Sequence, residues 1–220
     1  MRPNDTAADH RTTGRGADQV TVEGSERSGP VPWPRMCVAA CRDRLYRIDR
    51  GVTRGVAAWR SPWARRLLPA VESGAEHTKL WWAAAALLAA TGGRTGRRAA
   101  VTGLAGMAVA EAFSDGVLKR LCHRARPPQE LVPSQDADDR PDSSSFPSGH
   151  TAAAVAFTVG VAVLRPGAGL VCAVPATLIA TERVHTGAHY PSDVVAGAAV
   201  GLASAWLIRR TSRRPVQRVR

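Results

Sequence analysis

Three short segments of the sequence carry residues whose types and spacing could do chemistry. We call residues 119–127, 147–150 and 183–193 the site segments; their notable residues are Lys119, Arg126, Pro127, the run Pro147-Ser148-Gly149-His150, Arg183, His189 and Asp193. Together they supply two imidazoles, three cations, one carboxylate and a turn of small residues. This combination suits an anion with several charged oxygens, above all a phosphate.

The cations and the small-residue turn are expected to bind the oxygens of this anion. Guanidinium groups hold phosphate oxygens in pairs, and an ammonium adds a compact charge. The candidates are Lys119, Arg126 and Arg183, which we call the phosphate-site cations. Ser148 is a residue type that caps helices, so the backbone N–H groups of Ser148, Gly149 and His150 are predicted to point at the anion.

The two histidines and the carboxylate suit nucleophilic catalysis. Asp193 lies four residues after His189 in a helix that Pro191 can start, so its carboxylate is expected to hold one ring nitrogen of His189. The other nitrogen can then attack phosphorus. His150 is the candidate that protonates the leaving alcohol. Nearby acids lack the spacing of a divalent-metal site, so we expect chemistry without a metal or another cofactor.

The composition indicates where these segments sit. The 220 residues include 30 Lys+Arg against 18 Asp+Glu, a net charge of +12 that alone would suit a basic soluble domain or a nucleic-acid binder. The acids are unevenly placed, however, and residues 77–110, 143–181 and 194–220 contain none. The arginines flank apolar runs there instead of alternating with polar helix faces or stacking aromatics, which argues against nucleic acid as a partner.

Five apolar runs predict an all-α transmembrane bundle. They cover residues 80–93, 99–118, 151–164, 170–181 and 194–208. Only the second reaches the roughly 20 residues that cross a bilayer, but all are apolar or small on every side, unlike helices of a soluble domain. Gly197 and Gly201 have the GxxxG spacing of close helix packing in lipid. We therefore expect about five clear spans.

The flanking regions complete a four-part organisation. Residues 1–34 are polar and predicted to be disordered, and residues 71–208 form the membrane domain. Residues 35–70 are predicted to form amphipathic helices on the membrane surface, with an apolar stripe at 38, 41, 45, 48, 52, 56 and 59. A helix that packs this stripe on a protein core is the alternative. Residues 209–220 form a basic tail.

The arginines also predict the orientation in the membrane. If every run crosses once, the connection holding Arg94, Arg97 and Arg98 shares one side with the C-terminal tail, and the positive-inside rule makes that side the cytoplasm. The site segments then lie together on the extracytoplasmic face of a multi-pass cell-membrane protein. Five crossings place the arginine-rich N-terminal region outside as well, which conflicts with the same rule and leaves the choice between five and six spans open.

The three site segments, in this order and spacing, resemble the signature of the type 2 phosphatidic acid phosphatase (PAP2) family, over about residues 80–208. That superfamily also includes bacterial acid phosphatases and vanadium haloperoxidases. The resemblance implies a six-helix core and dephosphorylation through a phosphohistidine. His189 would be the nucleophile, Asp193 its partner and His150 the general acid. The implied phosphate ligands are Lys119, Arg126, Ser148, Gly149 and Arg183.

The expected function is removal of a phosphate or diphosphate group from a membrane lipid, such as phosphatidic acid, phosphatidylglycerol phosphate or a polyprenyl phosphate. The expected partners are this substrate and membrane lipids; the exact lipid and the oligomeric state stay open. Glu182 stands where the family usually has Ser, so its carboxylate is expected to pair with Arg183 and alter phosphate binding. The alternatives are a lipid transporter or scaffold without phosphatase activity and a vanadate-dependent haloperoxidase-like relative.

Overall fold

The computed structural model describes residues 33–59, 66–68, 70, 78–132 and 143–212, and no strand occurs among them. Its longer helices are α1 (Trp33–Ala57), α3 (Lys79–Thr91), α4 (Gly93–Phe113), α6 (Gly149–Ala162), α7 (Pro166–His185) and α8 (Pro191–Ser212). A π-helical turn η2 (Ser114–Leu118) and the short α5 (Lys119–Leu121) extend α4, and a 3-10 turn η3 spans Gln129–Leu131.

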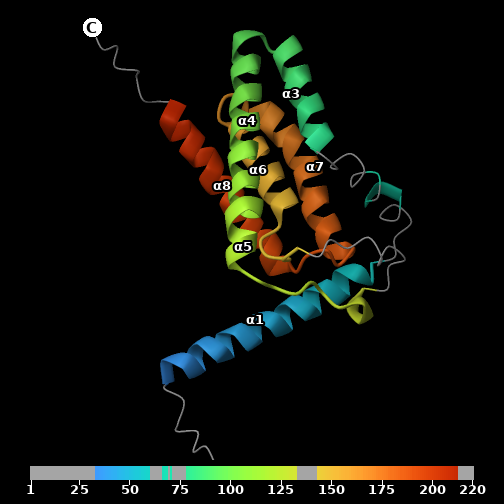
Figure 1. Cartoon of the computed structure of the whole chain (residues 1–220). Helices are drawn as coiled ribbons and strands as arrows, with labels where there is room; N and C mark the ends of the chain where they lie inside the picture. Colours follow the sequence, from blue (N-terminus) through green and yellow to red (C-terminus); the bar gives the residue numbers. More distant parts are fainter. Residues whose placement is uncertain (1–32, 60–65, 69, 71–77, 133–142, 213–220) are drawn as a thin grey trace, which may run out of the picture. The chain divides into compact units, whose positions relative to one another are not determined.

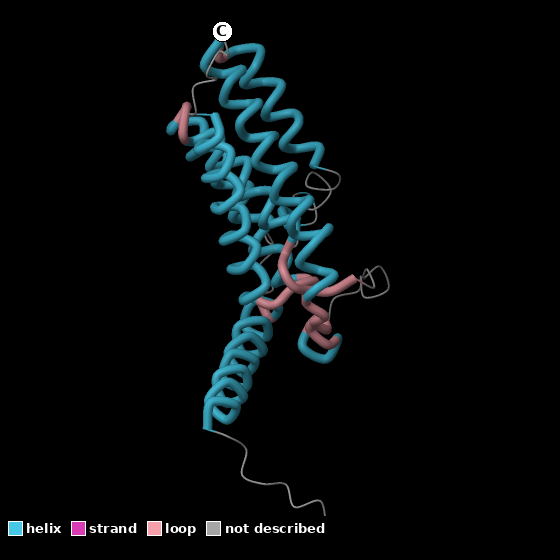
Figure 2. The backbone as a smooth tube through the Cα atoms, turned by 60° about the vertical axis from the view of Figure 1, so that its left-hand side comes forward, coloured by secondary structure: helices cyan, strands magenta, loops and turns pink. Residues whose placement is uncertain are grey.

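Helices α3, α4, α6, α7 and α8 pack side by side as a bundle, with α6 in contact with α4, α7 and α8 (Figure 1). The short connections between α3 and α4, α6 and α7, and α7 and α8 make these neighbours antiparallel. Residues 119–132 and 143–149 and the turn 186–190 therefore share one end of the bundle, which we call the site end. The tube view shows the same helices from another side, with the longer loops at one end and short connections at the other (Figure 2).

The five predicted runs each form a helix, and the fold class is therefore an all-helical membrane bundle. Three helices are long and apolar enough to cross a membrane, namely Gly93–Leu121, Pro166–His185 and Pro191–Ser212. Two shorter apolar helices, Lys79–Thr91 and Gly149–Ala162, accompany them. At 1.5 Å per residue the 13 residues of α3 reach only about 20 Å, less than a bilayer core.

At two basic flanks the helices extend beyond the predicted apolar runs. Arg94, Arg97 and Arg98 lie in the first turns of α4 and not in a connection. Helix α8 likewise continues to Ser212, so the predicted tail at 209–220 begins with a helical segment. Arginine is a good helix former, and Arg209 and Arg210 also suit the negative end of a helix dipole.

Close packing of α8 on α6 brings the two histidine-containing segments together. A Cβ atom on Gly197 would lie 2.4 Å from the carbonyl oxygen of Ser148, and one on Gly201 would lie 2.5 Å from that of Ala152. Both distances are below any tolerable contact, so only glycine permits this approach. The predicted role of the GxxxG spacing is confirmed, and the start of α6 lies beside the first turns of α8.

Helix α1 presents two different sides from residue 41 onward. The side chains of Leu45, Ile48 and Val52, all in the predicted apolar stripe, are about half exposed. Asp49 and Thr53 are buried. Each directly follows a residue of the stripe, Ile48 or Val52, and so points about 100° away from it around the helix. The alternative that packs the stripe on a protein core is therefore wrong for these residues. The predicted disordered tail lies outside the described residues up to position 32, and α1 begins at Trp33.

Candidate active site

His189 lies in the turn between α7 and α8 and has a fixed orientation. Its Nδ1 atom is 2.6 Å from the carbonyl oxygen of Ser145, and its backbone N–H donates to the carbonyl of Arg183 at 2.9 Å. Because a carbonyl oxygen only accepts hydrogen bonds, Nδ1 must carry the ring hydrogen when the imidazole is neutral. The lone pair is then on Nε2, which is the form that a nucleophilic histidine needs.

The surroundings of His189 keep its imidazole neutral. The side chain is only 3% exposed, and this burial lowers its pKa from 6.5 to about 3. Arg126, Arg183 and Lys119 also lower the pKa, while the hydrogen bond to Ser145 acts in the opposite direction. The three phosphate-site cations thus lie near His189, as the sequence predicted, and His189 is unprotonated near pH 7.

The contacts of Asp193 differ from the prediction. Its carboxylate accepts hydrogen bonds from Ser145 Oγ at 3.0 Å, the backbone N–H of Tyr190 at 2.9 Å and Arg124 Nη1 at 2.5 Å. The expected direct bond to the His189 ring is replaced by the carbonyl of Ser145, because the main chain at residue 145 lies between the two side chains. Asp193 therefore contacts His189 through Ser145.

The Pro-Ser-Gly-His segment opens α6, as predicted, with Ser148 at the N-cap position and Gly149 as the first helical residue. However, the backbone N–H of Ser148 donates to the carbonyl of Asp193 at 3.0 Å, so its predicted role as an anion donor was wrong. The Ser148 hydroxyl lies 3.0 Å from that of Thr151. Gly149 and His150 remain in the first turn, where N–H groups have no partner inside the helix.

The phosphate-site cations also contact protein groups that set their positions. Lys119 Nζ is 2.8 Å from Asp115 Oδ1, and Arg126 Nη1 donates to the carbonyl of Ala188 at 2.7 Å. Arg183 forms an ion pair with the buried Glu182, as predicted from the sequence. The carboxylate of Glu182 thus competes with any anion for Arg183.

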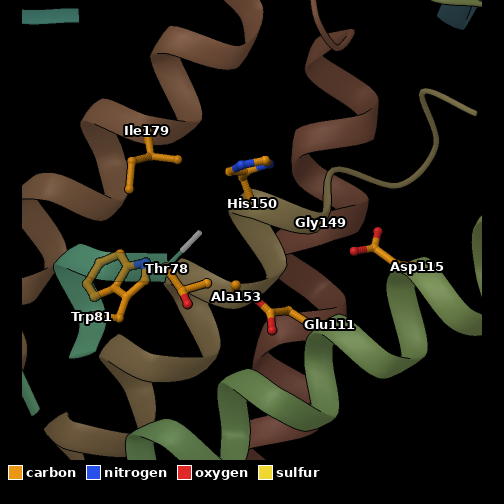
Figure 3. A pocket seen from close by; sticks show the side chains of 8 residues that line it. All are labelled: Thr78, Trp81, Glu111, Asp115, Gly149, His150, Ala153 and Ile179. Atoms are coloured by element: carbon orange, nitrogen blue, oxygen red, sulfur yellow. The ribbon is translucent and has the colours of Figure 1, made fainter. Parts of the chain in front are cut away.

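His150 borders a cavity of about 220 Å³ at the site end of the bundle (Figure 3). Glu111 and Asp115 lie on one side of this cavity, and Trp81 and Ile179 lie on the other. The phosphate-site cations are also charged neighbours of His150. His150 therefore combines an open side with the electrostatic environment of His189, as a proton donor to a leaving group requires.

Four residues outside the predicted set complete the surroundings of His189. Asp49, Arg124, Ser145 and Ser192 join Asp193 in one hydrogen-bonded group, which we call the Asp49 network. Asp49 belongs to α1, and it bonds Ser192 across 143 positions of sequence. Spacing could not reveal such a pair; the only signal was that Asp49 is one of just two acids in an arginine-rich helix. Within the described residues, no group of three metal-ligating side chains occurs.

The helical membrane bundle carries two histidines at one end, with the phosphate-site cations as charged neighbours of both. The model of the PAP2 superfamily matches residues 99–216, and the chain belongs to this family.

Two curated relatives share part of the chain. The lipid A 1-phosphatase of Rhizobium etli is 46% identical over 57 residues, which are 26% of this chain and 25% of that protein. The decaprenylphosphoryl-5-phosphoribose phosphatase of Mycobacterium tuberculosis is 35% identical over 123 residues, 54% of this chain and 65% of that protein. The matched region therefore spans a quarter of the length of the first relative and just under two thirds of the length of the second.

Two solved structures share the fold. The transmembrane PAP2 type phosphatidylglycerolphosphate phosphatase from Bacillus subtilis has a TM-score of 0.59 at 20% identity, with 80% of this chain and 90% of that chain covered. Aquifex aeolicus LpxE has a TM-score of 0.57 at 19% identity, with 73% and 93% covered. The architecture of the bundle is thus that of PAP2 membrane proteins.

Proposed function

We propose that this protein is a membrane phosphatase that hydrolyses a phosphate ester or diphosphate of a lipid through a phosphohistidine on His189. The observation that carries the proposal is the neutral, buried imidazole whose Nδ1–H is held by Ser145. This arrangement directs the lone pair of Nε2 to an anion, and the nearby cations would offset the negative charge that otherwise repels a nucleophile.

The reaction has two steps. In the first, His189 Nε2 forms a bond to phosphorus, the bond from phosphorus to the leaving oxygen breaks, and His150 donates a proton to that oxygen. Lys119, Arg126 and Arg183 bind the other phosphate oxygens, helped by the N–H groups of the first turn of α6. In the second step, His150 takes a proton from water, which attacks phosphorus and releases inorganic phosphate and His189.

A membrane lipid is the proposed substrate class. The matched relatives are named for lipid A and for a decaprenyl-linked phosphoribose, and the matched structure for phosphatidylglycerolphosphate. Phosphatidic acid and polyprenyl phosphates or diphosphates share with these an apolar tail that can stay in lipid. We place the site end on the extracytoplasmic face, because Arg97, Arg165 and Arg209 lie toward the opposite end of the bundle.

We also place α1 on the membrane surface beside the site end. Its half-exposed Leu45, Ile48 and Val52 suit contact with acyl chains, while exposed arginines on the same helix suit phospholipid headgroups. Accessibility of tags at both termini in intact cells tests this topology and the number of spans. An N-terminal tag that reacts only after permeabilisation would overturn the placement of α1.

The direct test of the function is phosphate release by purified, detergent-solubilised protein from a panel of lipid phosphates, with EDTA present. We expect release from at least one lipid and none by His189→Ala, with His123→Ala as a matched control at a histidine to which the proposed reaction assigns no role. No release from any lipid would favour a transporter or scaffold. Halide oxidation that requires added vanadate would favour a haloperoxidase-like function instead.

A further inference from the structure

The buried carboxylate of Asp49 in α1 contacts Arg124 and also Ser192, which closely follows the turn 186–190 that holds His189. Asp49 is 1% exposed and accepts hydrogen bonds from Arg124 Nη2 at 2.6 Å, Ser192 Oγ at 2.6 Å and the backbone N–H of Ser192 at 3.0 Å. A buried carboxylate is tolerated only when it is paired and hydrogen-bonded in this way. Asp49 thus joins α1 to the first turn of α8.

Arg124 bridges this carboxylate to a second one. Its Nη1 donates to Asp193 Oδ1 at 2.5 Å and to Ser192 Oγ at 2.6 Å, and its guanidinium carbon lies 4.4 Å from the centre of the Tyr190 ring. Burial alone would lower the pKa of Arg124, but the carboxylates of Asp49 and Asp193 raise the pKa above its ordinary value. The guanidinium therefore stays charged between its two partners.

The network reaches His189 through Ser145, which it holds at two atoms. The backbone N–H of Ser145 donates to the carbonyl of Arg124 at 3.0 Å, and its hydroxyl donates to Asp193 Oδ2 at 3.0 Å. These two bonds fix the remaining polar atom of Ser145, the carbonyl oxygen that accepts the Nδ1–H of His189. A shift of Arg124 would therefore turn the imidazole.

The charge of the network also favours a reaction at His189. Asp49 and Asp193 carry two negative charges when ionised, and Arg124 carries one positive charge, so the group has a net charge of −1. A phosphorylated imidazole that keeps its Nδ1–H is positively charged. Preorganised negative charge behind the ring stabilises the positive charge that develops as the N–P bond forms.

Resting on the function proposed above, we propose that Asp49 and Arg124 are positioning residues of the active site, which hold His189 through Asp193 and Ser145 and make its orientation depend on the docking of α1. Neither residue touches the phosphate. Their effect is on the orientation of the nucleophile and on the charge behind it, and it therefore falls on kcat more than on KM.

The first test uses the near-isosteric variant Asp49→Asn, which keeps the size of the side chain and removes its charge. We expect kcat for the best lipid phosphate to fall about 10- to 100-fold, the range that a small misplacement of a catalytic group produces, with KM within about threefold. Asp43→Asn, at an exposed acid of the same helix, is the matched control and should keep wild-type kinetics. Wild-type kcat in Asp49→Asn would overturn the proposal.

A second pair of variants separates positioning from folding. Arg124→Ala should lower kcat at least as far as Asp49→Asn, and Arg124→Lys should recover part of the loss because it keeps the charge. The double variant Asp49→Asn/Arg124→Ala should be no slower than Arg124→Ala alone, since both act through one path. Multiplication of the two losses in the double variant would contradict a shared path.

The last readout does not depend on turnover. In ¹⁵N NMR spectra of histidine-labelled protein, His189 should be a single Nδ1–H tautomer in the wild type and a tautomer mixture in Arg124→Ala, with the melting temperature recorded for both. An unchanged tautomer in the variant would overturn the inference, even for a protein that hydrolyses none of the lipids tested. Inactivity of the wild type, by contrast, would overturn only the proposed function.

Discussion

Two charged groups near His189 differ in sign and in what they contact. The phosphate-site cations lie close enough to His189 and His150 to act on both imidazoles. The Asp49 network holds two carboxylates and a single arginine and connects to the Nδ1 atom of His189. One group supplies positive charge for an anion, whereas the other supplies hydrogen bonds and negative charge for the ring.

This difference explains how two arginines only two residues apart have different roles. Arg126 donates to the carbonyl oxygens of Ala188 and Ser143, beside the turn that holds His189. Arg124 is paired with two carboxylates. A site that attacks a phosphate with a neutral imidazole needs both arrangements, because the anion must be attracted while the nucleophile is kept oriented.

The largest effect is expected where the leaving group receives its proton. His150→Ala should lower the turnover of a lipid phosphate by about 10²- to 10⁴-fold, the usual contribution of general acid–base catalysis. The first turnover of an aryl phosphate should be far less affected, since a phenolate leaves without a proton. Stopped-flow detection of the phenolate measures this difference. Equal losses for both substrates would remove His150 from the acid role.

A somewhat smaller loss is expected on the phosphate-binding side. Arg126→Ala should lower kcat/KM by about 10²- to 10³-fold, as removal of one preorganised donor does elsewhere, with a higher KM as well. A higher KM distinguishes this variant from Asp49→Asn and so tests the contrast between the two groups. Steady-state kinetics on one lipid phosphate suffice. An unchanged KM would mean that Arg126 has a positioning role like that of the Asp49 network and does not bind the phosphate.

A modest gain is expected where a carboxylate competes with phosphate. Glu182→Gln removes the negative partner of Arg183 while keeping the shape of the buried side chain. Inorganic phosphate should then inhibit about fivefold more strongly, equivalent to about 1 kcal/mol of binding. The inhibition constant of phosphate measures this change. Weaker inhibition would mean that the ion pair holds Arg183 in its binding position.

The buried imidazole is also expected to affect stability, through its dependence on pH. The pKa of His189 falls from 6.5 to about 3 on folding, so below pH 6.5 the unfolded chain binds a proton that the folded protein does not. Stability should therefore fall with pH between about 6.5 and 3, by up to about 1.4 kcal/mol per pH unit from this group. Melting temperatures of the wild type should fall more steeply over this range than those of His189→Asn. Parallel curves would contradict a buried neutral imidazole.

The sequence predicted the parts of this molecule that depend on neighbours along the chain. Apolar runs gave the helices, and the spacing between Gly197 and Gly201 predicted the close contact that sets α8 on α6. The pairing of Glu182 with Arg183 followed from adjacency alone.

Contacts through the main chain and across long separations could not be predicted in this way. The carbonyl of Ser145 occupies the position that the sequence assigned to Asp193. Every residue has a backbone carbonyl, so the residue type does not indicate this contact. Asp49 is separated from Ser192 by 143 positions, in a helix where Arg42, Asp43, Arg44, Arg47 and Arg54 are all exposed. Only the fold brings these residues to the nucleophile.

The measurement that tests the central claim most directly is identification of the phosphorylated residue. His150→Ala incubated with an aryl phosphate should accumulate a phosphoenzyme, because the leaving group needs no acid while the second step lacks its base. Peptide mass spectrometry at alkaline pH, with ³¹P NMR to identify the ring nitrogen, should find phosphate on Nε2 of His189. Phosphate on Nδ1, on another residue, or on no residue while the aryl phosphate is still consumed would contradict the account.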